Sequence, residues 1–358
     1  MTSDDKPWFA DPILHHRVTD LFTSLFSSLP TDAPPPPAAP AQDPRTPNTD
    51  ETRAHWSQAD QATRGMTDAL FGAEVVEDKA EVRDFTIPAF DGAQIDARLY
   101  VAAPAADGER PPLVLTFHGG GMTLTDFNMV FEVNLCHRLA KANVSVLSVD
   151  FRNAYVKPFP GGVDDCLAAV NWARNGQDLL GVGDCLVTFG SSGGGNLSMA
   201  TFIRGLQEGC TDQIDGIISE APFIAGQYPA EGLDTHTAYD GYSLTAQGLQ
   251  DMVNNYTTSN EDFENPAAWP LKVSDDVLAA FPPTLIIVEQ CDPLRSDGEA
   301  LFKRLRRLRV EGCSMIMRYG EVHCQALYFV ESDVAELHAE HLGAFVRVQA
   351  RNKRGREQ

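Results

Sequence analysis

The run Gly190-Ser191-Ser192-Gly193-Gly194, continued by Gly195-Asn196, lies between an apolar, β-branched stretch at 185–189 and a stretch at 196–203 with the composition of a buried helix. A strand that enters G-x-S-x-G and leaves as a helix is the context of a nucleophile elbow, whose turn is too tight for large flanking side chains. Gly190 and Gly194 therefore allow the strand and helix to pack closely, with Ser192 at the apex. Backbone N–H groups at the helix N-terminus, that of Gly193 first, favour an anion beside the serine.

Taken alone, the glycine run has two plainer interpretations: a turn that saves space, or a cradle for phosphate. The phosphate interpretation is the weaker one, because no lysine follows in the spacing G-x-x-x-x-G-K-[ST].

A second run, His118-Gly119-Gly120-Gly121, follows the apolar stretch 113–117 directly. Its N–H groups can complete an oxyanion hole with the N–H of Gly193. H-G-G-G after a strand, with G-x-S-x-G downstream, is far more specific than either run alone.

A reactive serine needs a base, and the base needs an orienting acid. In this architecture the chain order is serine, acid, histidine, each at the carboxyl end of a strand. Asp292 follows the strand-like stretch 284–291, and His323 follows the stretch 315–320. The spacings leave room for an insertion and for one helix, so this pair is the predicted acid and base.

Other residues compete for these roles. Asp297 stands at the start of the next helix and is predicted to cap it. Glu321 is so close to His323 that the short loop gives its side chain little room to turn back. His118 is predicted to hold its own loop by hydrogen bonds and not to act as a base.

The remaining histidines do not indicate a metal site. His338 and His341 are three residues apart on the last predicted helix, but no third ligand accompanies them, and their acidic neighbours favour a solvated face. The others, which have no partner pattern, are His15, His16, His55, His137 and His236. We therefore predict no metal.

The composition limits the class of protein. A length of 358 residues and a hydrophobic content of 43% suit one large α/β domain with a subsidiary element, or two ordinary domains. The formal net charge of −22 disfavours nucleic acids and anionic membranes as partners. Seven scattered cysteines without a C-x-x-C pair indicate reduced thiols. With no leader pattern and no apolar run near the ~18 residues of a membrane span, we expect a cytoplasmic protein.

Residues 1–75 form a predicted helical preface. An apolar stripe of helical period covers 13–29, and 51–70 is helical again. The Pro/Ala-rich stretch 31–48 between them is either an extended loop, the interpretation we favour, or a polyproline ligand for a partner.

The core is predicted over 76–220 and 284–350. Two alternating stretches, 82–87 and 95–101, form an antiparallel pair around Asp91-Gly92. From 113 onward, short apolar runs alternate with helical segments, which predicts a mostly parallel sheet with helices on both faces. Residues 221–283 interrupt this rhythm and are predicted to form part of a lid, whose aromatic residues favour an apolar pocket; the alternative is a long surface excursion. The last helix is expected to end near 348, with 351–358 as a frayed basic tail.

Four motifs together resemble the hormone-sensitive-lipase-like branch of the α/β-hydrolases, which includes bacterial carboxylesterases and arylacetamide deacetylase. They are H-G-G-G at 118–121, G-S-S-G-G-G-N-L at 190–197, D-P-L-R at 292–295 and E-V-H at 321–323. V-D-F-R at 149–152 and P-F-P at 158–160 resemble a further block of that branch. The similarity spans about residues 80–345 and implies an eight-stranded α/β-hydrolase fold with a helical cap.

The resemblance also implies roles for single residues. Ser192 is the implied nucleophile, His323 the base and Asp292 its orienter. The implied oxyanion donors are Gly120, Gly121 and Gly193, with His118, Gly119, Gly190 and Gly194 as the supporting loops. Two departures bear on substrate preference: Ser191 replaces an acidic residue or threonine, and Asn153-Ala-Tyr-Val156 replaces Leu-Ala-Pro-Glu.

The predicted activity is hydrolysis of short-to-medium acyl esters through an acyl-enzyme, without a cofactor. The alternatives are an amide or formamide hydrolase and a non-catalytic ligand receptor on the same fold, while an interaction scaffold rests on 31–48 alone. The predicted partner is a small-molecule ester. By analogy with the family, two copies can pair through 313–348.

Overall fold

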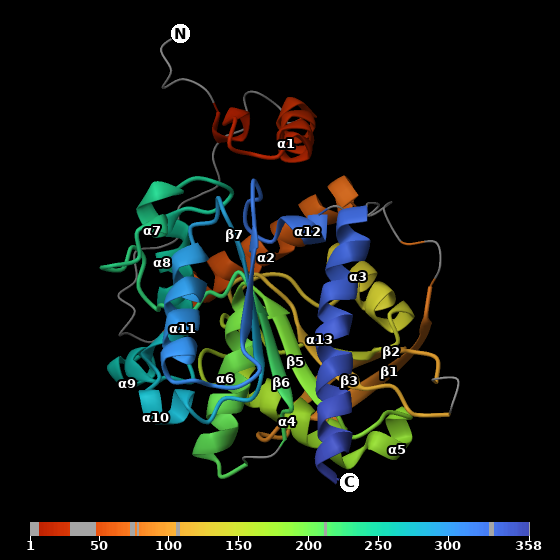
Figure 1. Cartoon of the computed structure of the whole chain (residues 1–358). Coiled ribbons are helices and arrows are strands. Elements are labelled where there is room, and N and C mark those ends of the chain that lie inside the picture. Colours follow the sequence, from red (N-terminus) through yellow and green to blue (C-terminus); the bar gives the residue numbers. More distant parts are fainter. Residues whose placement is uncertain are drawn as a thin grey trace.

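The computed structural model describes residues 7–28, 48–71, 76, 79–104, 108–210, 213–328 and 333–357. The proline-rich stretch therefore lies outside the described residues, apart from Asn48. A single eight-stranded sheet forms the centre, in the order β1-β2-β4-β3-β5-β6-β7-β8 (Figure 1). The strands are β1 (Glu81–Pro88), β2 (Gln94–Val101), β3 (Leu113–Phe117), β4 (Ser145–Val149), β5 (Leu186–Ser191), β6 (Gly216–Glu220), β7 (Thr284–Glu289) and β8 (Ser314–Arg318).

The sheet is antiparallel at one end and parallel elsewhere. β1 pairs with β2 and β2 with β4 in antiparallel register, whereas every pair from β4 to β8 is parallel. The predicted α/β-hydrolase fold with a mostly parallel eight-stranded sheet is therefore confirmed. β5, which carries the elbow, lies in the middle between β3 and β6, so both neighbours deliver their carboxyl ends beside it.

Both faces of the sheet are covered, which explains the unbroken apolar runs of the central strands. Leu113, Leu115 and Phe117 of β3 join the core beneath α4, α6 and α11, while Val114 joins the core beneath α3 and α13 (Figure 1). These helices are α3 (Val130–Lys141), α4 (Gly161–Asn175), α6 (Gly193–Gln207), α11 (Arg295–Arg307) and α13 (Asp333–Glu357), with the short α5 (Gln177–Leu180) and α12 (Gln325–Tyr328) between them.

Two separate stretches of chain lie over the carboxyl ends of the strands, and we call them together the cap. The first holds η2 (Trp8–Ala10), α1 (His16–Ser28) and α2 (Asp50–Phe71). The second is residues 221–283, of which α7 (Thr235–Ala238) and α8 (Ala246–Tyr256) lie near these ends. Its later part, with α9 (Asn260–Glu264), η3 (Pro270–Lys272) and α10 (Asp275–Leu278), lies beside the C-terminal half of α11 (Figure 1). Leu14 and Val18 pack on Cys291 and Val322, so the first stretch covers the loops that hold Asp292 and His323.

The C-terminal end differs from the prediction. Instead of fraying after 348, α13 continues to Glu357. Two ion pairs hold its last turns: Lys353 Nζ lies 3.0 Å from Asp215 Oδ2, and Arg354 lies 2.9 Å from Glu109. Cations at a helix C-terminus are also favoured by the helix dipole. The basic residues therefore extend the helix, because acidic partners far away in sequence meet them.

Two other expectations from the sequence concern membrane-spanning helices and the pairing of two copies. Among the described helices, none combines the length and the apolar character needed to cross a bilayer. β8 is an edge strand, and the predicted pairing of two copies through 313–348 stays a prediction.

Candidate active site

The elbow has the geometry that its glycines predict. Ser192 connects β5 to α6 with φ 57° and ψ −117°, outside the regions that L-residues favour. Its N–H donates to the carbonyl of Glu220 at the end of β6 (2.8 Å). A Cβ on Gly190 would lie 2.2 Å from the carbonyl carbon of Gly194. The backbones of Gly190 and Gly194 are therefore too close for a side chain between them. The strained serine is thereby held at the tip of the central strand.

The loop after β3 lies directly against this elbow. A Cβ on Gly193 would come within 2.5 Å of the Met122 nitrogen and 2.7 Å of the Gly121 nitrogen. Gly120 has φ +93°, and a Cβ there would meet the Leu124 carbonyl oxygen at 2.2 Å. The missing side chains thus allow the backbone of 120–122 and the start of α6 to converge beside Ser192.

His118 and its neighbours hold that loop. The His118 Nδ1–H and the Thr125 hydroxyl both donate to the carbonyl of Gly119, at 2.9 and 3.0 Å. The His118 ring is buried and stacks on Phe151 at 4.1 Å, and burial lowers its pKa to about 4. The ring is therefore neutral near pH 7. The structure places His118 as a hydrogen-bonding support of the loop, as the sequence predicts.

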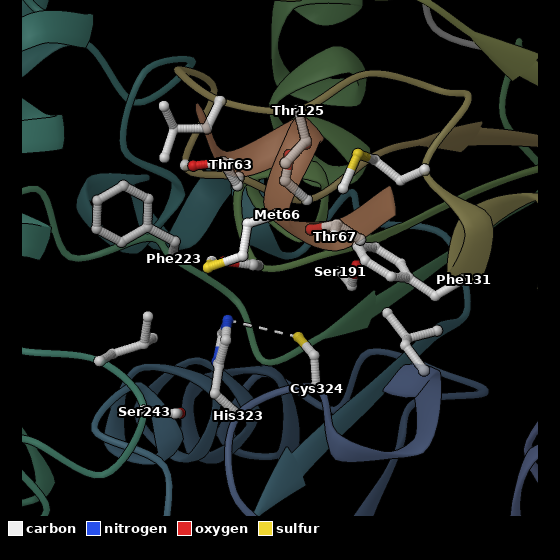
Figure 2. A pocket seen from close by; sticks show the side chains of 18 of the residues that line it. Thr63, Met66, Thr67, Thr125, Phe131, Ser191, Phe223, Ser243, His323 and Cys324 are labelled. Carbon is white, nitrogen blue, oxygen red and sulfur yellow. Dashed lines mark hydrogen bonds between the residues drawn. The ribbon is translucent and has the colours of Figure 1, made fainter. Parts of the chain in front are cut away.

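Asp292 and His323 meet as a pair. His323 Nδ1 lies 2.8 Å from Asp292 Oδ2, and both side chains are buried. The other oxygen of Asp292 accepts the N–H of Leu294 at 2.9 Å, which fixes the carboxylate. With Nδ1 engaged, Nε2 is the nitrogen left for chemistry, and it lies 3.4 Å from the sulfur of Cys324 (Figure 2).

The predicted role of Asp297 as a helix cap is wrong. Its Oδ2 accepts the N–H of Ala225 (3.0 Å) and the hydroxyl of Tyr228 (2.6 Å), and its Oδ1 lies 2.6 Å from His236 Nε2. Because His236 Nδ1 accepts the N–H of Ala230 (3.0 Å), we assign its proton to Nε2, which donates to Asp297. This carboxylate therefore anchors the second stretch of the cap to α11. His236 was missed because its partner is 61 residues away.

The prediction that His338 lies on a solvated face is also wrong, whereas the side chain of His341 is exposed. His338 is buried, and its Nε2 lies 3.3 Å from the Glu220 carboxylate, which Arg318 approaches at 3.9 Å. Burial opposes ionisation of Glu220, but His338 and Arg318 outweigh it and hold the pKa of this carboxyl below its usual value. No cluster of metal-ligating side chains occurs within the described ranges. Glu321, the other rival acid, pairs with Arg318 at 3.7 Å.

A cavity of about 450 Å³ opens over Ser192 and His323. Its wall is mostly apolar and comes from both the cap and the α/β core (Figure 2). The cap contributes Trp8, Phe22, Thr63, Met66, Thr67, Leu70, Phe71, Phe223, Leu249 and Met252, and the core contributes Gly120, Gly121, Met129, Phe131, Glu132 and Leu327, among others.

The aromatic side chains of 221–283 do not line this cavity as we expected, apart from Phe223. Tyr256 and Trp269 are buried in the core, with their rings 5.5 Å apart. They satisfy packing under the cap and not recognition of a ligand. Most aromatic lining comes instead from the first stretch of the cap and from α3.

One cavity residue has an ionisable side chain whose burial no sequence pattern indicates. Glu132, in the first turn of α3, is only 3% exposed, and its Oε1 accepts the N–H of Gly119 at 3.2 Å. Burial raises its pKa to about 7. No motif marks this residue, because its burial depends on how α3 meets the glycine loop.

Comparison with known proteins places this geometry in a family. Residues 114–327 match the family model described as alpha/beta hydrolase fold. An arylesterase from Saccharolobus solfataricus is 30% identical over 267 residues, which cover 74% of this chain and 83% of the relative. The brefeldin A esterase structure, described as a bacterial homologue of human hormone sensitive lipase, superposes with a TM-score of 0.80 and 30% identity over 98% of this chain and 97% of that one.

The chain belongs to the hormone-sensitive-lipase-like branch of the α/β-hydrolases. A second relative of this hydrolase, the carboxylic ester hydrolase LipN from Mycobacterium tuberculosis, is 31% identical over 72% of this chain and 66% of its own length. Because these homologues are esterases, we conclude that the hydrolase is a carboxylesterase.

Proposed function

We propose that this carboxylesterase hydrolyses short-to-medium acyl esters through a Ser192 acyl-enzyme, with His323 as base and Asp292 as its orienter. The observation that carries the proposal is the buried 2.8 Å contact between His323 Nδ1 and Asp292 Oδ2, in a cavity that Ser192 also lines. That contact leaves Nε2 of the imidazole to exchange protons with the serine.

The reaction begins when Ser192 Oγ attacks the ester carbonyl carbon and His323 Nε2 takes its proton. The carbonyl oxygen becomes an oxyanion, which accepts hydrogen bonds from the N–H groups of Gly120, Gly121 and Gly193. Asp292 stabilises the imidazolium that has formed. When the tetrahedral adduct collapses, the C–O bond to the alcohol breaks, and His323 returns the proton to the departing oxygen.

Water completes the cycle. His323 removes a proton from a water molecule as its oxygen attacks the acyl carbon, a second oxyanion forms in the same place, and Ser192 leaves with the proton from His323. No cofactor takes part in these steps. The cavity volume of about 450 Å³ and its apolar lining favour alkyl or aryl acyl groups of modest length.

The test is hydrolysis of p-nitrophenyl esters with acyl chains of roughly two to twelve carbons, by wild type and Ser192→Ala. We expect turnover of the shorter esters by wild type and a loss of at least about 10³-fold in the variant. Equal rates for the two proteins would contradict the proposal. Matched anilides in the same panel show whether the enzyme prefers amides, the main alternative.

A further inference from the structure

The helix α2 reaches from the cap to the loop that carries the oxyanion donors. Its Asp60 is 2% exposed although it is charged. Asp60 Oδ1 accepts the N–H of Thr125 at 2.5 Å, and Oδ2 accepts the hydroxyl of Tyr155 at 2.8 Å. Arg64, one turn further along α2, lies 2.6 Å from the same carboxylate. A buried carboxylate with this many donors is fixed in place.

Thr125, which Asp60 holds, has an unfavourable backbone conformation. Its φ is +70°, a value that is rare for a β-branched residue. Its carbonyl accepts hydrogen bonds from Arg64 and from Asn153 Nδ2, each at 2.9 Å. Side chains thus hold both polar backbone groups of Thr125, which is how a strained residue persists in a folded protein.

The hydroxyl of Thr125 passes this restraint to the glycine loop, because it donates to the carbonyl of Gly119 at 3.0 Å beside the bond from His118 Nδ1. The peptide between Gly119 and Gly120 is planar and trans, so its C=O and N–H point in opposite directions. Whatever fixes the Gly119 carbonyl therefore also fixes the direction of the Gly120 N–H.

We propose that Asp60 is a positioning residue for the oxyanion hole. Acting through Thr125, Asp60 aims the N–H of Gly120. This inference rests on the proposed function, because it gives Gly120 a role in that mechanism. It also accounts for the departure from the family sequence at 153–156, because Asn153 and Tyr155 supply two of the hydrogen bonds in the same network. Correct seating of the cap helix thereby becomes a condition for catalysis.

The rival explanation is that Asp60 only fastens α2 to the body of the protein. The two explanations differ in kinetics. A misplaced oxyanion donor lowers kcat and kcat/KM together, because the donor acts in the transition state. A loosened cap raises KM and lowers Tm while kcat stays near the wild-type value.

The first experiment replaces the transmitting hydroxyl. Thr125→Val keeps the shape of the side chain and removes the donor to Gly119, whereas Thr125→Ser keeps the donor. We expect Thr125→Val to lose about 10–100-fold in kcat, because a misaimed donor should cost less than the about 10²–10³-fold that follows the loss of a whole donor. Thr125→Ser should stay within about threefold of wild type.

The second experiment compares Asp60→Asn with Asp68→Asn, which removes an exposed carboxylate from the same helix. For each variant, kcat, KM and Tm are measured. The affinity for an alkyl trifluoromethyl ketone, which forms a tetrahedral adduct with the serine, is compared with the affinity for the corresponding secondary alcohol, which cannot. We expect Asp60→Asn to weaken ketone binding about as much as it lowers kcat/KM, with alcohol binding and the Asp68 variant unchanged.

The proposal is overturned if Thr125→Val retains the wild-type kcat. It is equally overturned if Asp60→Asn changes KM and Tm but neither kcat nor ketone affinity. Should Asp60→Asn not fold, the two Thr125 variants still decide. The Ser192→Ala control separates the two proposals: if that variant retains wild-type turnover the serine mechanism itself is wrong, whereas its inactivity beside a fully active Thr125→Val rejects only the role of Asp60.

Discussion

The strand ends and the cap build the two sides of the same cavity by different means. At the strand ends, Ser192, Asp292 and His323 follow β5, β7 and β8, so the sheet positions them and their motifs are short and local. In the cap, position depends on single buried contacts between distant residues, such as Asp297 with His236 and Asp60 with Thr125. The proposed catalytic groups are therefore placed by the sheet, and the cavity wall is held by a few polar contacts.

The sharpest test of this comparison uses two buried aspartates five residues apart. Asp292→Asn leaves the geometry in place but favours the wrong tautomer of His323, so we expect kcat to fall about 10⁴-fold with little change in Tm. Steady-state kinetics and thermal unfolding measure both quantities. A variant that retains more than a tenth of the wild-type kcat would contradict the role of Asp292.

Asp297→Asn should show the opposite pattern. Its amide N–H₂ would face either the Nε2–H of His236 or the donors around Ala225, so a buried mismatch destabilises the protein by about 2–4 kcal/mol. We expect kcat to stay within about tenfold of wild type in the protein that remains folded. Urea unfolding measures the free energy of unfolding. A stability equal to wild type would show that this contact does not hold the cap.

Glu132, which contacts the glycine loop at the end of β3, tests whether a buried charge there destabilises the fold. In the folded protein its pKa is about 7, above the usual value of 4.5. Between these two pH values the folded state binds more protons than the unfolded one, so this group makes stability fall as pH rises from about 4.5 to 7. Glu132→Gln keeps an acceptor for Gly119 and removes the charge. We expect its free energy of unfolding, relative to wild type, to rise by about 3 kcal/mol between pH 4.5 and pH 8.

The control for that measurement is the exposed Glu231→Gln. Its difference from wild type in the free energy of unfolding, measured at the same pH values, is the reference for the difference at Glu132. A Glu132 variant whose difference is independent of pH would contradict the assignment of a raised pKa.

The smallest expected effect concerns the cap wall. Met66 lines the cavity yet is 53% exposed, so Met66→Ala removes contact area without opening a void in the core. We expect kcat/KM to fall about threefold to tenfold for the longest esters that wild type accepts, and to change little for acetate. Gln61→Ala, exposed on the same helix, is the matched control. Equal losses across all chain lengths would mean that Met66 does not contact the acyl chain.

The sequence alone predicts the strands and the mostly parallel sheet well, because apolar strands and βα alternation are local patterns. The elbow and the glycine loop are equally readable, since Gly190, Gly120 and Gly193 stand where a Cβ would collide with the backbone. The predicted pair of Asp292 and His323 also lies together in the structure.

The errors occur where a residue's environment is set by distant chain. His338 looked solvated from its neighbours in sequence, but Glu220 and Arg318 meet it from two strands. The basic end of α13 looked like a frayed tail until Asp215 and Glu109 supplied its counter-charges. Asp297 and Glu132 follow the same logic, because neither the cap contact nor the burial beside Gly119 leaves a local pattern.

The hydrogen bond from Thr125 to Asp60 has a consequence for how such enzymes diverge. Exchanging one helix of the cap would be an easy way to change the substrate range, since α2 supplies five residues of the cavity wall and none of the proposed catalytic groups. Asp60 and Arg64 limit that freedom. A transplanted helix must bring a carboxylate to the same turn, or the recipient gains a new pocket and loses the geometry that makes the pocket useful.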